Sequence, residues 1–297
     1  INLETNLTIA SYFNDNIAPE RLLRYLEAST GERIIPEETL IIFDEIQSSE
    51  RALTALKYFC EETPEYHIAA AGSLLGVAIN RQHYSFPVGK VETLTLYPLD
   101  FEEYLGARSQ KLLSEEIRRA YEKMEPLPDA LHQKAFLKSG SFLDVPLVQN
   151  EILDNYIADM AKYASNTDSV KIRACYNSIP AQLAKDNKKF QYKVVQKGGS
   201  AALFGASIEW LNLAGVVLKC QRINQAIEPI AVYTDLSAFK LYMGDVGLLT
   251  MKSGLSQQTV LSGEGNTFMG AVTENYVAQQ LAAKGYDLYY WESSSTA

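Results

Sequence analysis

The stretch that decides the fold is Leu40-Ile41-Ile42-Phe43-Asp44-Glu45, a run of four apolar residues that ends in two acids. An unbroken apolar run rich in β-branched and aromatic side chains is typical of a central strand in a parallel sheet covered on both faces. In such sheets, ligands bind at the carboxyl ends of the strands. The stretch therefore predicts that Asp44 and Glu45 face a ligand crevice. For the hexapeptide alone, the alternative is a strand that ends in a solvated acidic turn.

The next buried strand is expected over residues 67–72 and leads directly to Ser73. Neighbouring parallel strands end at the same edge of a sheet, so Ser73 is expected near the two acids. Its hydroxyl can donate one hydrogen bond and accept another, which suits contact with a phosphate or a water molecule. The structural alternative is a turn at Gly72-Ser73 that caps a helix over residues 74–79.

Further periodic patterns predict an α/β arrangement up to residue 107. We expect helices over 18–28, with Pro19 in the first turn, and over 51–62, then a third strand over 93–96 and a short helix over 100–105. Beyond residue 107 we expect mostly helix over 108–165, interrupted by Pro126, Pro128 and 140–146, then shorter helices and strand pairs over 168–250, a helix over 267–283 and a strand over 288–291.

Composition excludes several classes of protein. The 297 residues are 47% hydrophobic and 21% charged, as in globular proteins, and their length favours two domains. No apolar run approaches the roughly 18 residues of a membrane helix, so we expect no membrane span. The cysteines Cys60, Cys175 and Cys220 lack CxxC spacing and indicate reduced thiols of a cytoplasmic protein. The three histidines also lack the spacing of metal ligands.

The net charge of −9 is unevenly distributed. Residues 1–107 carry 7 basic and 17 acidic residues, whereas residues 171–222 carry 9 basic and 2 acidic residues. Within 168–222 we expect a helix, a turn, a second helix that starts at Ser178-Ile179-Pro180, a strand pair in which residues 190–195 alternate like a wing strand, and a further helix. A basic winged helix of this kind makes DNA a candidate partner of residues 171–222. The alternatives remain open, because lysines also complement helix C-termini and many winged helices bind only protein.

The motifs, taken in order, resemble those of prokaryotic AAA-superfamily P-loop ATPases that carry a C-terminal region with winged-helix and restriction-endonuclease-like folds. The matching motifs in the first part of the chain are Ile1-Asn2-Leu3-Glu4, Phe43-Asp44-Glu45-Ile46-Gln47, Ala71-Gly72-Ser73 and Leu96-Tyr97-Pro98-Leu99-Asp100-Phe101-Glu102-Glu103-Tyr104. Those in the later part are Ser178-Ile179-Pro180-Ala181-Gln182-Leu183, Ile208-Glu209-Trp210-Leu211, Ala214-Gly215, Met243-Gly244-Asp245-Val246-Gly247-Leu248, Thr273-Glu274-Asn275-Tyr276-Val277 and Tyr289-Tyr290-Trp291.

This resemblance implies an α/β fold class: a truncated P-loop NTPase parallel sheet followed by a helical and winged-helix α+β region. It divides the chain into an ATPase core (1–107), a helical lid or linker (108–167), a winged-helix-like domain (168–250) and the start of a nuclease-like domain (251–297).

The resemblance also implies ATP and Mg²⁺ as ligands. Asp44, in the motif called Walker B, would hold Mg²⁺, Glu45 would be the catalytic carboxylate, and Ser73 would be the sensor of the γ-phosphate. Glu274 matches the first acidic position of the nuclease-like fold; the alternative is an ordinary carboxylate on a helix face.

The sequence departs from the family at its phosphate-binding loop, GxxxxGK[ST]. Gly89-Lys90 is followed by Val91, and Tyr84 stands where the first glycine belongs. Because that loop supplies backbone donors and a lysine for the phosphates, we expect this 297-residue chain to be inactive, and truncation before Ile1 to be the cause. The chain also ends before the further acids and the lysine of a nuclease site.

Two functions therefore compete. The first is an AAA-type ATPase whose nucleotide cycle drives a C-terminal effector module. The second is a winged-helix module that binds nucleic acid or protein without ATPase activity. Oligomer formation is compatible with both.

Overall fold

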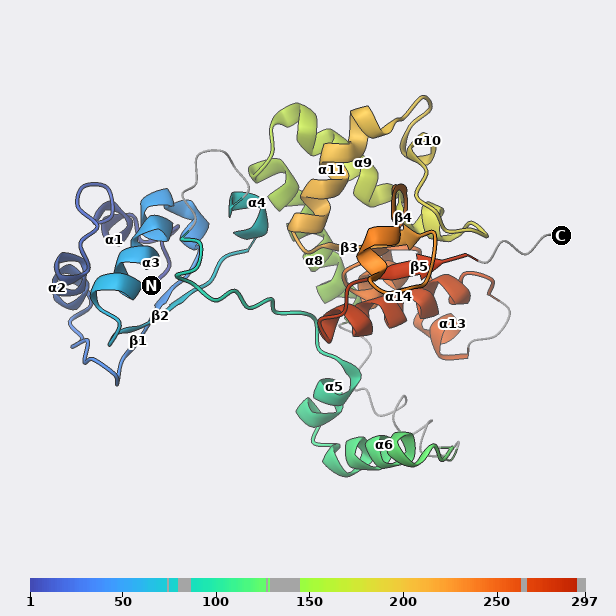
Figure 1. Ribbon diagram of the computed structural model, residues 1–297, viewed down its shortest axis with the longest axis horizontal. Helices are drawn as coiled ribbons and strands as arrows, with labels where there is room; N and C mark the ends of the chain where they lie inside the picture. The colour runs from blue at the N-terminus through green and yellow to red at the C-terminus, as the bar shows by residue number, and fades with distance from the viewer. Residues whose placement is uncertain (74, 80–86, 127, 129–144, 263–265, 293–297) are drawn as a thin grey trace. The chain divides into compact units, whose positions relative to one another are not determined.

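A computed structural model describes residues 1–73, 75–79, 87–126, 128, 145–262 and 266–292 (Figure 1). The chain divides into two compact units, Ile1–Leu96 with Leu213–Gly215, and Tyr97–Asn212 with Val216–Ala297. The first unit contains α1 (Leu7–Ser11), α2 (Pro19–Thr30), β1 (Leu40–Phe43), the 3-10 helix η1 (Ile46–Ser48), α3 (Glu50–Glu62), β2 (His67–Ala70) and α4 (Leu75–Ile79). Across the described ranges of both units, we find no helix that combines the length and the apolar character of a membrane span.

Strand β1 of the first unit has a backbone partner on each edge. On one edge it pairs in parallel with β2, so that Phe43 lies opposite Ala70. On its other edge the N-terminal residues run parallel to it. The amide of Asp44 donates to the carbonyl of Ile1 at 2.8 Å, and the amide of Leu3 donates to the carbonyl of Asp44 at 2.9 Å. The backbone on both sides therefore fixes the point where β1 ends.

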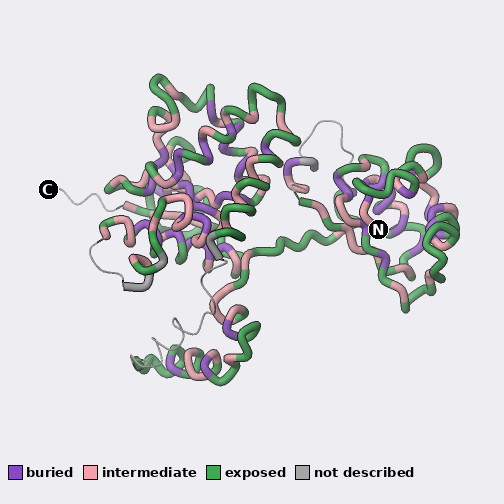
Figure 2. Tube along the Cα trace, turned by 180° about the vertical axis from the view of Figure 1, so that it is seen from behind, coloured by how far each residue is buried: buried purple, intermediate pink, exposed green. Residues whose placement is uncertain are grey.

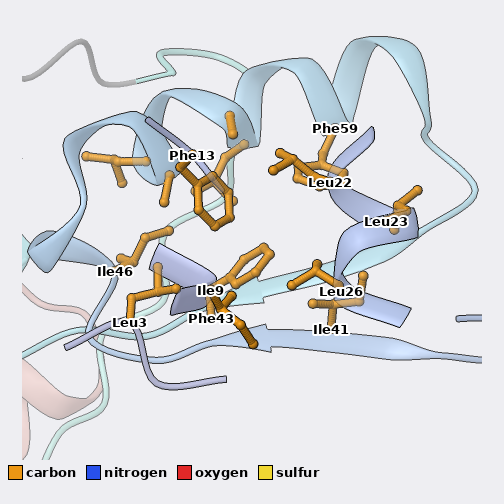
Figure 3. Close-up of a cluster of buried hydrophobic side chains, with 14 residues drawn as sticks. Leu3, Ile9, Phe13, Leu22, Leu23, Leu26, Ile41, Phe43, Ile46 and Phe59 are labelled. Atoms are coloured by element: carbon orange, nitrogen blue, oxygen red, sulfur yellow. The ribbon is translucent and has the colours of Figure 1, made fainter. Parts of the chain in front are cut away.

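The side chains of β1 alternate between a buried and an exposed face. Ile41 and Phe43 are 5% and 0% exposed and pack in the core formed with α1, α2 and α3 (Figure 3). Leu40 and Ile42 point the other way and are 57% and 48% exposed. The prediction that this strand is covered on both faces is therefore wrong for the part of the chain that the structure describes, because all three helices pack on the same face of the strand.

Helix boundaries in the first 107 residues confirm the sequence patterns. Pro19 stands in the first turn of α2, where its missing N–H costs nothing. The Ser49 side chain accepts from the amide of Ala52 and caps α3. Asp100 and Glu103 form a capping box at α5 (Phe101–Ala107).

The third predicted strand, over residues 93–96, is wrong. Residues 91–100 form no strand or helix, and residues 92–97 are exposed (Figure 2). A strand needs a neighbour to pair with its backbone groups, and among the described residues this segment has none.

The second unit combines helices with a three-stranded sheet of order β4-β3-β5. In it, β3 and β4 are antiparallel, with an irregularity between Gln221 and Arg222, and β3 and β5 are parallel. Besides α5, its elements are α6 (Lys111–Lys123), α8 (Val145–Lys162), α9 (Asn166–Leu183), α10 (Tyr192–Val195), α11 (Ala201–Leu213), β3 (Val217–Ile223), η2 (Ile230–Tyr233), β4 (Thr234–Met243), α12 (Val246–Lys252), α13 (Gln257–Ser262), α14 (Met269–Ala283) and β5 (Tyr289–Trp291).

The expected helix start at residues 178–180 is wrong, because α9 continues through Pro180 to Leu183. Proline lacks the N–H that would bond to the carbonyl of Tyr176, which weakens the helix locally. Tyr176, Ile179 and Leu183 are nevertheless buried, and the amide of Ala184 donates to the carbonyl of Pro180 at 3.0 Å. Burial of this face therefore outweighs the lost hydrogen bond.

The expected wing strand over residues 190–195 is also wrong. Tyr192–Val195 form the single helical turn α10. Phe190 alone resembles a strand residue, since its amide donates to the carbonyl of Phe239 on β4 at 2.9 Å. The two rings stack with their centroids 5.3 Å apart, which anchors the segment and leaves the next residues able to turn.

Ile41 and Ile42 provide a matched test of the one-sided core. We expect Ile41→Ala to lower the unfolding free energy of the first unit by about 2 to 5 kcal/mol, because it leaves a cavity. Ile42→Ala should lower it by less than about 1 kcal/mol, because the side chain is already half exposed. Hydrogen exchange of the β1 peptide at increasing urea measures both values. Equal losses at the two positions would contradict one-sided burial.

Candidate functional site

Asp44 is the first residue after β1 and is half-buried. Its carboxylate accepts two hydrogen bonds: Oδ2 from Nδ2 of Asn2 at 2.9 Å, and Oδ1 from the amide of Glu45 at 3.0 Å. Oδ1 of Asn2 in turn accepts from the amides of Glu4 and Thr5, which fixes the amide group of Asn2. The carboxylate of Asp44 is thus oriented by a side chain from the neighbouring N-terminal segment.

Glu45 occupies a left-handed backbone conformation, with φ of 52°. This conformation costs a residue with a side chain roughly 1–2 kcal/mol, so it persists only where neighbouring contacts hold it. Here the next amide, that of Ile46, donates to the carbonyl of Ala71 at 3.1 Å. The carboxylate of Glu45 accepts a short hydrogen bond from Nε2 of Gln47.

The end of β2 lies against this acidic turn. The amide of Ala71 donates to the carbonyl of Phe43 at 2.8 Å, so Ala71 is bonded to the chain on both sides of Asp44 and Glu45. Ser73 follows two residues later and is exposed. The structure thus places the backbone of all three predicted site residues at the same end of two adjacent strands.

The donor set at this turn fits a magnesium ion that is held mainly by water and phosphate. Mg²⁺ commonly takes one or two carboxylates and keeps several waters. An ionised carboxylate has about four lone-pair positions, and the two hydrogen bonds to Asp44 leave positions for a metal-bound water. Within the described residues, no group of three or more His, Cys, Asp or Glu side chains could form a protein-only metal site.

Two further members of this site, Asn2 and Gln47, were not predicted from the sequence. Both are neutral amides that donate to one of the two acids. Gln47 lies two residues after Glu45, and its position in a tight turn was a signal that could have been used. Asn2 gave no such signal, since its contact depends on pairing across 42 positions of sequence.

The basic segment 171–222 is partly neutralised in the folded chain. Five of its nine basic residues have an acidic partner: Lys171 with Asp168, Lys188 with Glu274, Lys189 with Glu292, Lys219 with Glu209, and Arg222 with Asp235. Helix α11 itself carries no lysine or arginine. The charge available to a nucleic acid is therefore much smaller than the sequence count of nine.

Glu274 lies on α14 in a cluster of donors. Its Oε1 accepts from Nζ of Lys240 at 2.7 Å and from the hydroxyl of Tyr242 at 2.5 Å, and its Oε2 accepts from Nζ of Lys188. Partial burial, the largest single influence, raises the pKa of Glu274, but the hydrogen bonds from Lys188, Lys240 and Tyr242 together outweigh it and lower the pKa to about 2. The carboxylate is ionised and anchors α14 to β4 and to the residues after α9.

Two acids at the end of one parallel strand and a serine after the next lie at the edge where α/β sheets bind their ligands. Comparison with known families agrees for the first part of the chain: residues 1–105 match a family described as an AAA domain. This match supports an AAA-type P-loop ATPase domain in that segment. Residues 132–259 match a domain of unknown function (DUF8612). Searches of curated proteins and of solved structures gave no match.

The Glu274 cluster gives a pH-dependent prediction. A carboxyl group whose pKa falls from 4.5 to about 2 on folding contributes stability that is present above pH 4.5 and is lost as the pH falls towards 2. We expect Glu274→Gln to lower the unfolding free energy of the second unit by about 2 to 4 kcal/mol at pH 7, because it leaves two lysines without their partner. The difference from wild type should shrink below pH 4.5.

Urea titrations followed by tryptophan fluorescence measure this effect, since Trp210 and Trp291 both belong to the second unit. Glu209→Gln is the control, because Glu209 pairs with Lys219 at 3.6 Å and its side chain is 53% exposed. We expect that substitution to cost less than about 1 kcal/mol. A loss for Glu274→Gln that does not change with pH would contradict the assignment.

Proposed function

We propose that residues 1–105 supply the acidic residues that activate water in an ATP-hydrolysing site. We also propose that ATP hydrolysis at this site drives the second unit, which acts as an effector. The observation that carries the proposal is the Asp44-Glu45 turn, bonded on one side to the N-terminal segment and on the other to the end of β2. In an AAA-type domain this is the edge of the sheet where a nucleotide binds.

In this proposal each site residue has one task. Asp44 would hold a magnesium-bound water, Glu45 would polarise the attacking water, and the hydroxyl of Ser73 would donate to the γ-phosphate or to that water. When bound, Mg²⁺ would neutralise charge on the phosphates. Asn2 keeps the carboxylate of Asp44 aimed at this position, since its own amide is fixed by the turn at Glu4 and Thr5.

The 297 residues contain no GxxxxGK[ST] motif, so the sequence lacks the phosphate-binding loop of such a site. We propose that a further segment supplies it. Two features of the first unit favour this. Among the described residues β2 pairs only with β1, which leaves its other edge for another strand. Leu40 and Ile42 are exposed on the sheet face that the described helices leave uncovered.

For the second unit we propose a winged-helix-like region over residues 168–250, with 108–167 as a helical lid and 251–297 as the start of a nuclease-like domain. Helices α9, α10 and α11 are followed by the antiparallel pair β3 and β4, which is the order of helices and wing in winged-helix proteins. The bond from Phe190 to Phe239 supports this arrangement, because it adds a short strand-like contact to β4.

The second candidate function is a binding module without ATPase activity. For such a module, a protein partner is favoured over DNA. In winged helices that read DNA, a helix of the helix-turn-helix lies in the major groove. At the corresponding position, α11 has the sequence AALFGASIEWLNL, with one acid and no base. Such a helix offers little attraction to phosphates.

The ATPase proposal predicts the behaviour of two proteins. The 297-residue chain should hydrolyse ATP no faster than its Glu45→Gln variant, because the phosphates have no loop to hold them. A longer product of the same gene that contains a GxxxxGK[ST] segment should show magnesium-dependent hydrolysis, which Glu45→Gln should reduce at least about 100-fold. Steady-state phosphate release measures both rates.

Two outcomes would contradict this prediction. The first is hydrolysis by the 297-residue chain that is sensitive to Glu45→Gln. The second is a longer protein that contains the loop and binds no ATP, in which case the binding-module function would stand. Glu50→Gln is a suitable control, since Glu50 is exposed in the first turn of α3.

Salt dependence tests the DNA interface. Within the described residues, four basic residues of segment 171–222 have no acidic partner: Arg173, Lys185, Lys193 and Lys197. We therefore expect weak duplex binding, with a slope of log affinity against log salt no steeper than about −4. Fluorescence anisotropy between low and physiological salt gives this slope. A slope near −8 would mean that the five ion pairs open to the phosphates.

A further inference from the structure

Gln47 is hydrogen-bonded to the proposed catalytic carboxylate. It lies in η1 and is 5% exposed, although glutamine is usually a surface residue. Its Nε2 donates to the carboxylate of Glu45. A buried glutamine that donates to an ionised acid forms a charge-assisted hydrogen bond, which is stronger than one between neutral groups.

The other end of the same amide touches the neighbouring strand. A Cβ atom added at Gly72 would lie 2.1 Å from Oε1 and 3.1 Å from Cδ of Gln47. No real side chain tolerates such a distance, so the amide packs directly on the backbone that follows β2. Gly72 immediately precedes Ser73, the proposed phosphate sensor. The side chain of Gln47 therefore lies between the catalytic acid and the segment that carries the sensor.

Backbone contacts limit the freedom of this arrangement. Glu45 is in the left-handed conformation, and the bond from Ile46 to Ala71 holds the turn against the end of β2. The turn has only one residue, Ile46, between Glu45 and Gln47. A shift of Gly72 towards the turn therefore displaces the amide of Gln47, and with it the hydrogen bond to the carboxylate.

We infer that Gln47 is a positioning residue that orients the carboxylate of Glu45 and couples it to the Gly72-Ser73 segment. The inference rests on the proposed ATPase function, since it assigns a role at that site. In this inference, contact of a phosphate with Ser73 moves Gly72, and Gly72 moves the amide of Gln47. The amide then changes the orientation of the catalytic carboxylate.

The link is tested in the 297-residue chain without nucleotide, by NMR of the side-chain amide of Gln47, assigned with the variant Gln47→Met. Glu45→Gly removes the acceptor and suits the φ of 52°, so the fold should tolerate it. Gly72→Ala displaces the amide from the other side. Gly106→Ala is the matched control, because a Cβ there meets nothing within 4 Å.

Loss of a hydrogen bond to a charged group should speed amide exchange with solvent by roughly tenfold or more in Glu45→Gly and Gly72→Ala. Exchange in Gly106→Ala should equal that of wild type. If Gly72→Ala does not fold, Glu45→Gly still decides the first half of the link. Exchange that is unchanged in Glu45→Gly, or unchanged in a folded Gly72→Ala, overturns the inference.

A kinetic measurement separates this inference from the proposed function. In the longer protein that contains the phosphate-binding loop, Gln47→Met should lower kcat roughly tenfold and leave KM for Mg-ATP within about twofold, because it disturbs the orientation of Glu45 and not nucleotide binding. An unchanged kcat overturns the positioning role. Failure of the proposed function is recognised differently, since the wild-type longer protein would then show no turnover.

Discussion

Parallel backbone pairing on both edges of β1 determines the geometry of the first unit. The segment Ile1–Leu3 bonds to Asp44 on one edge, and β2 bonds to Phe43 on the other. Both partners come from other parts of the sequence, yet both bond to the chain where β1 ends. Because parallel strands present their carboxyl ends at one edge, any polar residue placed just after them is gathered there. The acidic turn owes its position to this pairing and not to its own composition.

Two neutral amides then determine how the acids of that turn are oriented. Asn2 donates to Asp44 and Gln47 donates to Glu45, so each carboxylate is held by a group that adds no charge. A lysine or arginine in either place would neutralise the acid and compete with a metal ion. An amide orients the carboxylate and leaves its full negative charge available to a cation. The arrangement therefore suits a site that works with Mg²⁺ and phosphates.

The sequence predicted those features that depend on local patterns. Apolar runs, helical periodicity and Pro19 located β1, β2, α2, α3 and α5, because strand and helix propensities act over a few residues. The errors arose where contacts with distant parts of the chain determine the local structure. Residues 93–96 have strand character but lack a partner among the described residues, and Pro180 stays inside α9 because buried neighbours compensate for its lost hydrogen bond. Equally, no local pattern reveals that only one face of β1 is covered.

The basic segment shows the same limit for electrostatics. A count along residues 171–222 gives an excess of seven positive charges, but Lys188 and Lys189 meet Glu274 and Glu292, which lie far outside that window. Folding brings Glu274 on α14 and Glu292, just after β5, onto the lysines that follow α9. The net charge of a stretch of sequence therefore differs from the charge of the folded surface. The same contact turns Glu274 into an ionised anchor held by three donors. One set of ion pairs therefore weakens the argument for a nucleic-acid surface and fixes the C-terminal helix to the sheet.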